Sequence, residues 1–247
     1  LQFAWWIGHV TVVVSTVLYY LCYLTNYYTM SLPAYSFALM GALASYAVAS
    51  YKSMGKLQFN MQFAAQVASN DSMQYLLLAF VWYTQPALLV TLVPFAVFSA
   101  LHTLTYFHGT VVPVLFPAAT SATPSDAKPY LARLSASADM AARKYYMTAM
   151  HFVARWEVAV VLAWTILQTV LFQVSFYVPF AYMMFLRNRY ICSSYHQEAF
   201  RHLRRTMDRH LVDNPNAHTG IRRLYVSTRD FISSLAGPLH MPHPPAQ

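Results

Sequence analysis

The chain has 247 residues, of which 57% are hydrophobic and only 10% are charged. A soluble domain carries about a quarter charged residues, so this composition excludes an ordinary water-soluble protein. The formal net charge of +8 is concentrated late in the chain, because nine of the sixteen Lys and Arg residues lie between Arg187 and Arg229. On a membrane-embedded body, such a basic end is typical of binding to anionic lipid headgroups rather than to nucleic acid.

The first two apolar segments predict an antiparallel pair of transmembrane helices. Residues 3–23 and 31–51 carry no charge, and about twenty apolar residues in a helix cross a ~30 Å hydrocarbon core. Trp5 and Trp6 stand at one end of the first segment and several tyrosines at the other, as two interfacial aromatic belts would require. The mixed residues 53–72 that follow predict an interfacial helix.

Two longer apolar segments, 73–107 and 156–186, are each interrupted by proline. The first has 35 residues, which would make a straight helix of ~52 Å, whereas two full spans need about forty residues. Basic residues flank both segments on both sides, and the positive-inside rule then favours entry and exit on the cytoplasmic face. We expect two short hairpins, turning near Gln85–Pro86 and between Gln173 and Pro179. One kinked, tilted span in each place is the alternative.

Hairpins that occupy mostly one leaflet would widen that leaflet and favour curved membrane. Two spans and two hairpins would also leave both termini in the cytoplasm. Between the hairpins, prolines predict a flexible loop over 109–128, and the apolar period of 130–151 predicts an amphipathic interfacial helix. The predicted fold is therefore an all-α integral membrane protein with a polytopic domain over 1–190.

The last quarter, 191–237, predicts two basic amphipathic helices before a disordered tail, 238–247. From residue 197 to residue 212 apolar side chains recur every three or four positions, and the other face carries Arg201, Arg204, Arg205 and Arg209. In the second helix the predicted membrane-binding residues are Ile221, Arg222, Arg223, Leu224, Tyr225, Arg229, Phe231, Ile232 and Leu235. A bulky apolar face with Arg opposite is typical of an interfacial helix. Packing of this face on the membrane domain or on a partner protein is the alternative.

No catalytic, metal or cofactor site is recognisable. His196, His202 and His210 are six and eight residues apart, not the three or four that place two ligands on one helix face. Polar residues within apolar segments are functional by default, which makes His102 and Glu157 candidates. The structural interpretation is favoured for both: His102 would hydrogen-bond between helices, and Glu157 would be hydrated beside Arg155.

The remaining polar residues are explained without a catalytic or ligand-binding role. His9 lies one turn from the Trp pair, so an interfacial position accounts for it. Asn70 opens a glycosylation sequon that the predicted topology places on the cytoplasmic side, where it would be unused. Cys22 and Cys192 are not expected to form a disulfide. Because the first residue is Leu1 and not Met, we expect an N-terminal piece to precede it, and no cleavable signal peptide is recognisable.

Four stretches, in order and with matching spacing, resemble the transmembrane protein 33 family, whose fungal members are the Pom and Per pore-membrane nucleoporins. They are AQVASNDSMQYLLLAF (65–80), VPFAVFSALHTLTY (93–106), PFAYMMFLRNRY (179–190) and GIRRLYVSTRDFISSLAGP (220–238). The resemblance covers about residues 1–238. It implies residence in the endoplasmic reticulum and nuclear envelope, links to reticulon-type proteins and nucleoporins, and no established catalytic activity.

The resemblance further implies that, as in fungal members, a C-terminal amphipathic helix binds curved membrane and an import receptor. The matching positions here are 221–235. The first hypothesis is therefore a protein that shapes or senses curvature and contributes to tubule organisation and to the distribution or biogenesis of nuclear pore complexes. The second is an adaptor that recruits an import receptor or stress sensor. A lipid-handling protein is the third, and it would need a cavity lined by His102, Glu157 or Gln168. Self-association is left open.

Overall fold

The computed structural model describes residues 1–54, 66–116, 130–214 and 218–235, with the backbone alone at 224, 228 and 231–235. Every regular element in these ranges is a helix, as the sequence predicts. The chain divides into two compact units, Leu1–Ala199 and Phe200–Gln247.

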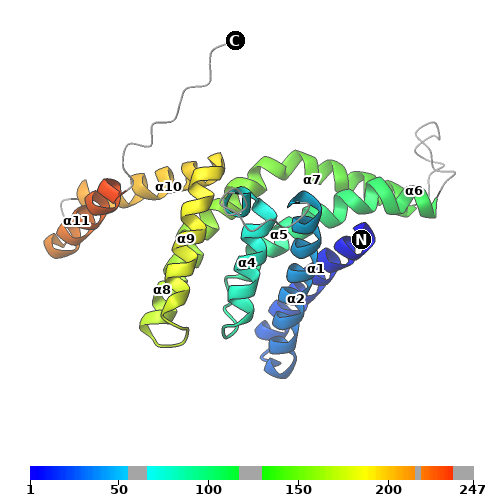
Figure 1. Cartoon of the computed structure of the whole chain (residues 1–247), viewed down its shortest axis with the longest axis horizontal. Helices are drawn as coiled ribbons and strands as arrows, with labels where there is room; N and C mark the ends of the chain where they lie inside the picture. The colour runs from blue at the N-terminus through cyan, green and yellow to red at the C-terminus, as the bar shows by residue number, and fades with distance from the viewer. Residues whose placement is uncertain (55–65, 117–129, 215–217, 236–247) are drawn as a thin grey trace, which may run out of the picture. The chain divides into compact units, whose positions relative to one another are not determined.

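Helices α1 (Gln2–Leu24) and α2 (Tyr28–Met54) form the antiparallel pair at the N-terminal end (Figure 1). Both predicted segments are therefore helical, and both helices are long and apolar enough to cross a membrane. They cross at two glycines: a Cβ atom on Gly41 would lie 2.8 Å from the carbonyl oxygen of Gly8, and one on Gly8 would lie 2.9 Å from that of Gly41. Small residues at such crossings let two membrane helices approach backbone to backbone.

The segment predicted over 73–107 breaks where expected. Helix α4 (Asp71–Tyr83) ends at Tyr83, and α5 (Leu92–Tyr106) starts after an irregular turn, 84–91. The side chain of Asn70 accepts a hydrogen bond from the backbone nitrogen of Met73 at 3.0 Å and so caps the start of α4. Beyond α5 the helix continues through a π-helical segment, η1 (Phe107–Val111), into α6 (Val112–Leu115), so the predicted loop 109–128 begins later than expected.

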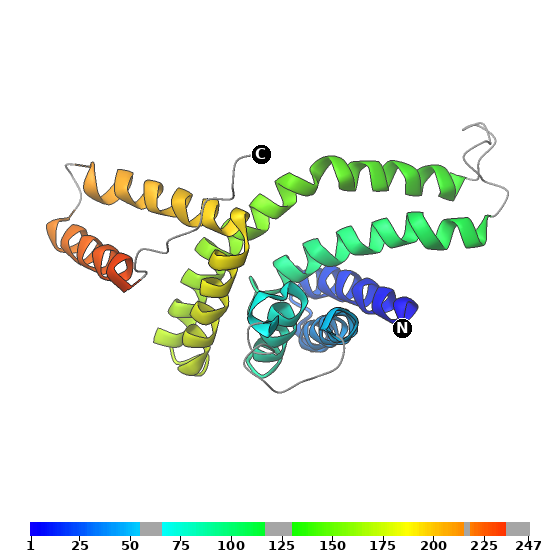
Figure 2. The same cartoon turned by 45° about the horizontal axis from the view of Figure 1, so that its top comes forward.

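The predicted helix 130–151 does not end at His151. Helix α7 (Tyr130–Arg155) continues through the π-helical η3 (Trp156–Val161) into α8 (Leu162–Val170), and Figure 2 shows the helix bending where α7 gives way to α8. Residues 130–170 contain neither Gly nor Pro, so nothing in this stretch stops a helix. The 41-residue helix is the third that is long and apolar enough to cross a membrane.

A turn over 171–176 separates α8 from α9 (Tyr177–Cys192). It overlaps the range predicted for the second break, 173–179, but begins two residues earlier, and Pro179 lies in the first turn of α9. In both views α8 and α9 lie side by side and run in opposite directions (Figures 1 and 2). Helix α10 (Ser194–Met207) follows at once. The break at 171–176 joins two neighbouring helices, as a hairpin requires. The break at 84–91 does not join a packed helix pair, because α4 packs on α2 and α9 while α5 packs on α1 and α7. The position of both breaks in a bilayer stays a prediction.

The second unit contains the end of α10, the π-helical η4 (Asp208–Val212) and α11 (Thr219–Leu235). Both predicted basic helices are therefore present as helices. Of the predicted interfacial helix 53–72, residues 66–69 are helical and 55–65 lie outside the described residues. Residues 117–129 of the predicted loop and the predicted tail 238–247 lie outside them too.

Candidate functional site

The two turns between short helices, 84–91 and 171–176, are hydrogen-bonded to each other. The backbone nitrogen of Ser175 donates to Gln85 Oε1 at 3.1 Å, and Gln85 Nε2 donates to the hydroxyl of Tyr177 at 3.0 Å. The same hydroxyl lies 3.0 Å from Thr84 Oγ1. The tips of the two predicted hairpins therefore lie at the same level of the first unit.

Neighbouring helices satisfy the irregular backbone of the first turn. The hydroxyl of Tyr20 on α1 donates to the carbonyl of Leu89 at 2.6 Å, and Trp156 Nε1 donates to the carbonyl of Val90 at 3.0 Å. Non-helical backbone is tolerated at membrane depth only where protein groups replace water as partners. The turn 84–91 meets that condition at these carbonyls.

Glu157 is the most buried acidic residue described, with 0% of the whole residue's surface exposed. The hydroxyl of Tyr75 on α4 donates to Glu157 Oε1 at 2.9 Å, and His196 Nε2 on α10 lies 2.7 Å from Oε2. The hydroxyl of Tyr182 on α9 donates to the backbone oxygen of Glu157 at 2.9 Å. The expectation that Glu157 is hydrated beside Arg155 is therefore wrong, because residues two apart on a helix point in different directions.

His196 completes this cluster from the start of α10. Its ring is 2% exposed, and Nδ1 lies 3.0 Å from the hydroxyl of Ser193, just before α10. We call Tyr75, Glu157, Tyr182, Ser193 and His196 the Glu157 network. It joins α4, η3, α9 and α10 through groups whose polar atoms have partners, as buried polar groups require.

A second ion pair borders the Glu157 network. Arg189 on α9 pairs with Asp71 at the start of α4, and its guanidinium lies 5.4 Å from the ring centroid of Tyr75. The Tyr75 ring is thus held by a cation on its face and by the carboxylate at its hydroxyl. Sequence reasoning missed this cluster because its members come from four separate parts of the chain.

The histidines near the N-terminal end pack on each other. His9 is 1% exposed and its Nδ1 lies 2.9 Å from the hydroxyl of Ser99, so it is buried between α1 and α5. Its predicted interfacial depth in a bilayer stays a prediction. The ring of His102 lies 5.3 Å from Trp5 and 4.9 Å from His9, centroid to centroid. His102 itself is exposed at the edge of a groove.

That groove, between α5 and α7, measures about 320 Å³ and is lined by Phe98, Leu101, His102, Thr105, Ala142, Arg143, Tyr146 and Met150. Its size is at the lower end for a small-molecule pocket. Of the three residues that the lipid-handling hypothesis names as alternatives, His102 lines the groove, whereas Glu157 belongs to the buried network. The groove therefore gives that hypothesis little support.

In the second unit, Asp208 on η4 gathers donors from two helices. The hydroxyl of Tyr225 and Arg229 Nη1, both on α11, donate to Asp208 Oδ1 at 2.9 and 3.0 Å. Arg204 Nε on α10 lies 3.6 Å from Oδ2. The hydroxyl of Tyr225, and then Arg229 and Arg204, lower the pKa of this carboxyl group from its ordinary value.

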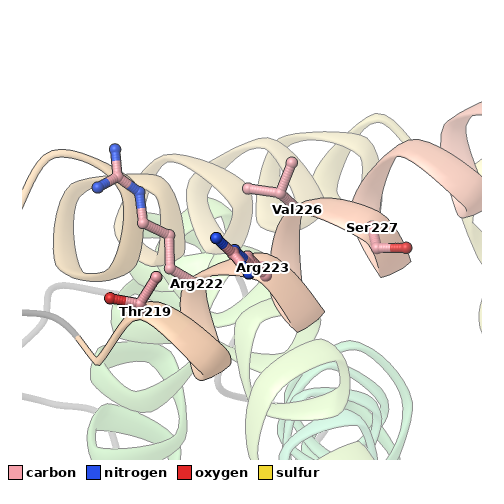
Figure 3. Close-up of a pocket in the computed structure, with 5 residues that line it drawn as sticks. All are labelled: Thr219, Arg222, Arg223, Val226 and Ser227. Carbon is pink, nitrogen blue, oxygen red and sulfur yellow. The ribbon is translucent and has the colours of Figure 1, made fainter.

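The predicted membrane-binding residues divide by environment. Arg201, Arg204, Arg205 and Arg209 are exposed, and Ile221 is 56% exposed. Arg222 and Arg223 line a shallow hollow on α11 with Thr219, Val226 and Ser227 (Figure 3). The side chains of Leu224, Phe231, Ile232 and Leu235 lie outside the described residues. Over the described ranges, no three His, Cys, Asp or Glu side chains are grouped so that they could hold a metal ion.

Comparison with known proteins gives three fungal relatives. Nucleoporin POM33 of Chaetomium thermophilum is 33% identical over 221 residues, which is 84% of this chain and 76% of the relative. Tetra-spanning protein 1 of Schizosaccharomyces pombe is 28% identical over 220 residues, 86% of this chain and 76% of the relative. Pore membrane protein of 33 kDa from Saccharomyces cerevisiae is 26% identical over 239 residues, 91% and 80% of the two chains.

No solved structure matches this chain. The family model described as Transmembrane protein 33/Nucleoporin POM33 matches residues 1–238, which is nearly the whole chain. This match and the 33% identity to the Chaetomium thermophilum protein confirm the resemblance seen in the four stretches of sequence. The chain is a member of the transmembrane protein 33/nucleoporin POM33 family.

Proposed function

We propose that this protein shapes or senses membrane curvature in the endoplasmic reticulum and nuclear envelope. In this role it is not an enzyme, and it contributes to tubule organisation and to the distribution or biogenesis of nuclear pore complexes. Reticulon-type proteins, nucleoporins and an import receptor are its proposed partners. The names of the relatives, two of which refer to a pore, support this assignment.

The observation that carries the proposal is the pair of short hairpins whose tips meet. Helix α4 has 13 residues and α9 has 16, so they rise about 20 and 24 Å, less than a ~30 Å hydrocarbon core. The hydrogen bond that the Ser175 backbone donates to Gln85, and the one that Gln85 donates to Tyr177, hold both tips at one level. Two hairpins that stop at the same depth would add volume to one leaflet and not to the other.

The basic helices would add to this effect from the cytoplasmic surface. An interfacial helix inserts its apolar face below the headgroups, and its Arg residues attract anionic lipid. Arg201, Arg205 and Arg209 on α10 and η4 and Arg222 and Arg223 on α11 are exposed and available for this contact. Both termini would then lie in the cytoplasm.

Topology mapping tests the hairpins. Reporters inserted at 25–27, 85–86, within 109–128 and at the C-terminus should give a lumenal signal at 25–27 alone. A lumenal signal within 109–128 would mean that the segment before it crosses the whole membrane and is not a hairpin. The proposed widening of one leaflet would then be wrong.

Vesicle shape tests the wedge directly. The full chain reconstituted into vesicles should reduce their diameter, as measured by electron cryomicroscopy. The matched control lengthens α8 and α9 by two Leu-rich turns each, about 11 Å, so that both arms cross the bilayer. Equal diameters with both chains would contradict the proposal.

The adaptor function is the second candidate, and the hollow formed by Thr219, Arg222, Arg223, Val226 and Ser227 favours it. Two exposed Arg beside hydroxyl groups suit an acidic partner protein as well as lipid. Arg222→Glu with Arg223→Glu should reduce vesicle binding by α11 if lipid is the ligand. Retained vesicle binding with loss of a nuclear-envelope partner would favour the adaptor.

A further inference from the structure

Asp208 in the second unit is held by residues that the membrane-binding face of α11 also needs. Tyr225 lies in the predicted apolar stripe of α11, and Arg229 lies one turn further on the same side of the helix. Both donate to Asp208 Oδ1, at 2.9 and 3.0 Å. The guanidinium of Arg229 also lies 5.9 Å from the ring centroid of Tyr225. One edge of α11, which carries Tyr225 and Arg229, therefore contacts η4.

The same edge cannot face η4 and a bilayer at once. If Tyr225 and Arg229 are to reach the headgroup level, they must leave the carboxylate of Asp208. A lipid phosphate offers the same chemistry as that carboxylate: an anionic oxygen that accepts from a hydroxyl and from a guanidinium. Phosphate is thus the natural competitor for these donors.

The contact is weak enough for this exchange. The side chains of Asp208 and Arg229 are 28% and 25% exposed, so water and salt screen their attraction. A solvent-exposed ion pair changes an equilibrium by about fivefold or less. The other charged groups around the contact are Arg204, which faces Asp208 Oδ2, and Asp230, which binds Arg229 Nη2 at 3.0 Å.

We propose that Asp208 is an internal substitute for a lipid phosphate, which keeps α11 folded on η4 until the headgroups of anionic lipids take over Tyr225 and Arg229. This inference rests on the proposed membrane binding of α11. It adds a regulated step: the helix binds a neutral membrane poorly and opens on an anionic one.

The test uses the full chain in vesicles that contain increasing fractions of phosphatidylserine in phosphatidylcholine. A cysteine at the exposed position 221 (Ile221→Cys), in a Cys192→Ser background, carries an environment-sensitive fluorophore that reports insertion of α11. Asp208→Asn should lower the phosphatidylserine fraction needed for half-maximal insertion by about two- to fivefold. Tyr225→Phe should shift it in the same direction by less.

Asp213→Asn is the matched control, because Asp213 is exposed in the same unit and its replacement changes the net charge equally. It should shift the curve much less than Asp208→Asn. Equal shifts for the two variants would mean that net charge alone is sensed and would overturn the proposal. No insertion at any lipid composition in any variant would instead overturn the membrane binding of α11, and the substitute role of Asp208 with it.

Discussion

Glu157 and Asp208 each accept a hydrogen bond from a tyrosine hydroxyl and pair with a nitrogen-bearing side chain, His196 or Arg229. Their surroundings differ, since the Glu157 side chain is 1% exposed and that of Asp208 is 28% exposed. Water cannot replace a lost partner at Glu157, whereas water and salt can reach Asp208. The same kinds of group therefore form a contact that is closed to solvent in the first unit and one that is open to solvent in the second.

The largest expected effect follows from removing the nitrogen partner of the buried acid. His196→Ala leaves Glu157 with one donor fewer, and breaking a buried pair from one side costs about 3–5 kcal/mol. Thermal unfolding of the full chain in detergent should show this loss, and hydrogen exchange should rise in the first turns of α10.

Glu198→Gln is the control, because Glu198 lies on the same helix but is 48% exposed, with its partners His151 and Arg155 3.5 and 3.9 Å away. Its replacement should cost at most about 1 kcal/mol. A comparable loss from both substitutions would contradict the distinction between the buried and the exposed pairs on α10.

A smaller effect is expected from removing the tyrosine hydroxyl group that donates to Glu157 or to Asp208. Tyr75→Phe removes the donor to Glu157 Oε1 and keeps the ring under Arg189, so it should lower stability by about 1–3 kcal/mol. Tyr225→Phe removes the donor to Asp208 and should leave global unfolding unchanged. Unfolding curves measured side by side test this, and equal shifts would mean that burial does not set the difference.

The smallest effect is the response of Asp208 to acid. Because the pKa of Asp208 is lowered where α11 rests on η4, the contact is complete at neutral pH and is lost as the pH falls below the ordinary value of 3.8. Spin labels on cysteines at His202 and Ser227, in a Cys192→Ser background, should move apart in acid. Asp208→Asn should abolish this pH dependence. An unchanged response to acid in that variant would show that Asp208 is not the group that titrates.

The apolar helices could be predicted from the sequence because length and charge decide them. The expected spans 3–23 and 31–51 agree with α1 and α2 to within three residues at each end. The break at 84–91 contains Pro86, where the first turn was expected, whereas the break at 171–176 contains no proline and Pro179 lies inside α9. The continuation of α7 into α8 was missed, although the absence of Gly and Pro from 130 to 170 was a usable signal.

The Glu157 network could be predicted only in part. The spacing of Arg155 and Glu157 already indicates that they face different sides, so the hydrated position could have been rejected. Its partners could not be found, because Tyr75 is 82 residues before Glu157 and His196 is 39 residues after it. Such pairs form through tertiary packing, and no local period of the sequence carries them. The contact of Asp208 with Tyr225 and Arg229 is hidden for the same reason.

The position of His196 also bears on how the protein is made. During synthesis Tyr75 and Glu157 are made before His196, so the carboxylate of Glu157 at first lacks the partner of its Oε2. A buried carboxylate that lacks some of its hydrogen-bond partners destabilises the fold more than an apolar side chain in its place. The Glu157 network can therefore be complete only after the start of α10 has been made, and a chain cut short before residue 196 would leave Glu157 without this partner.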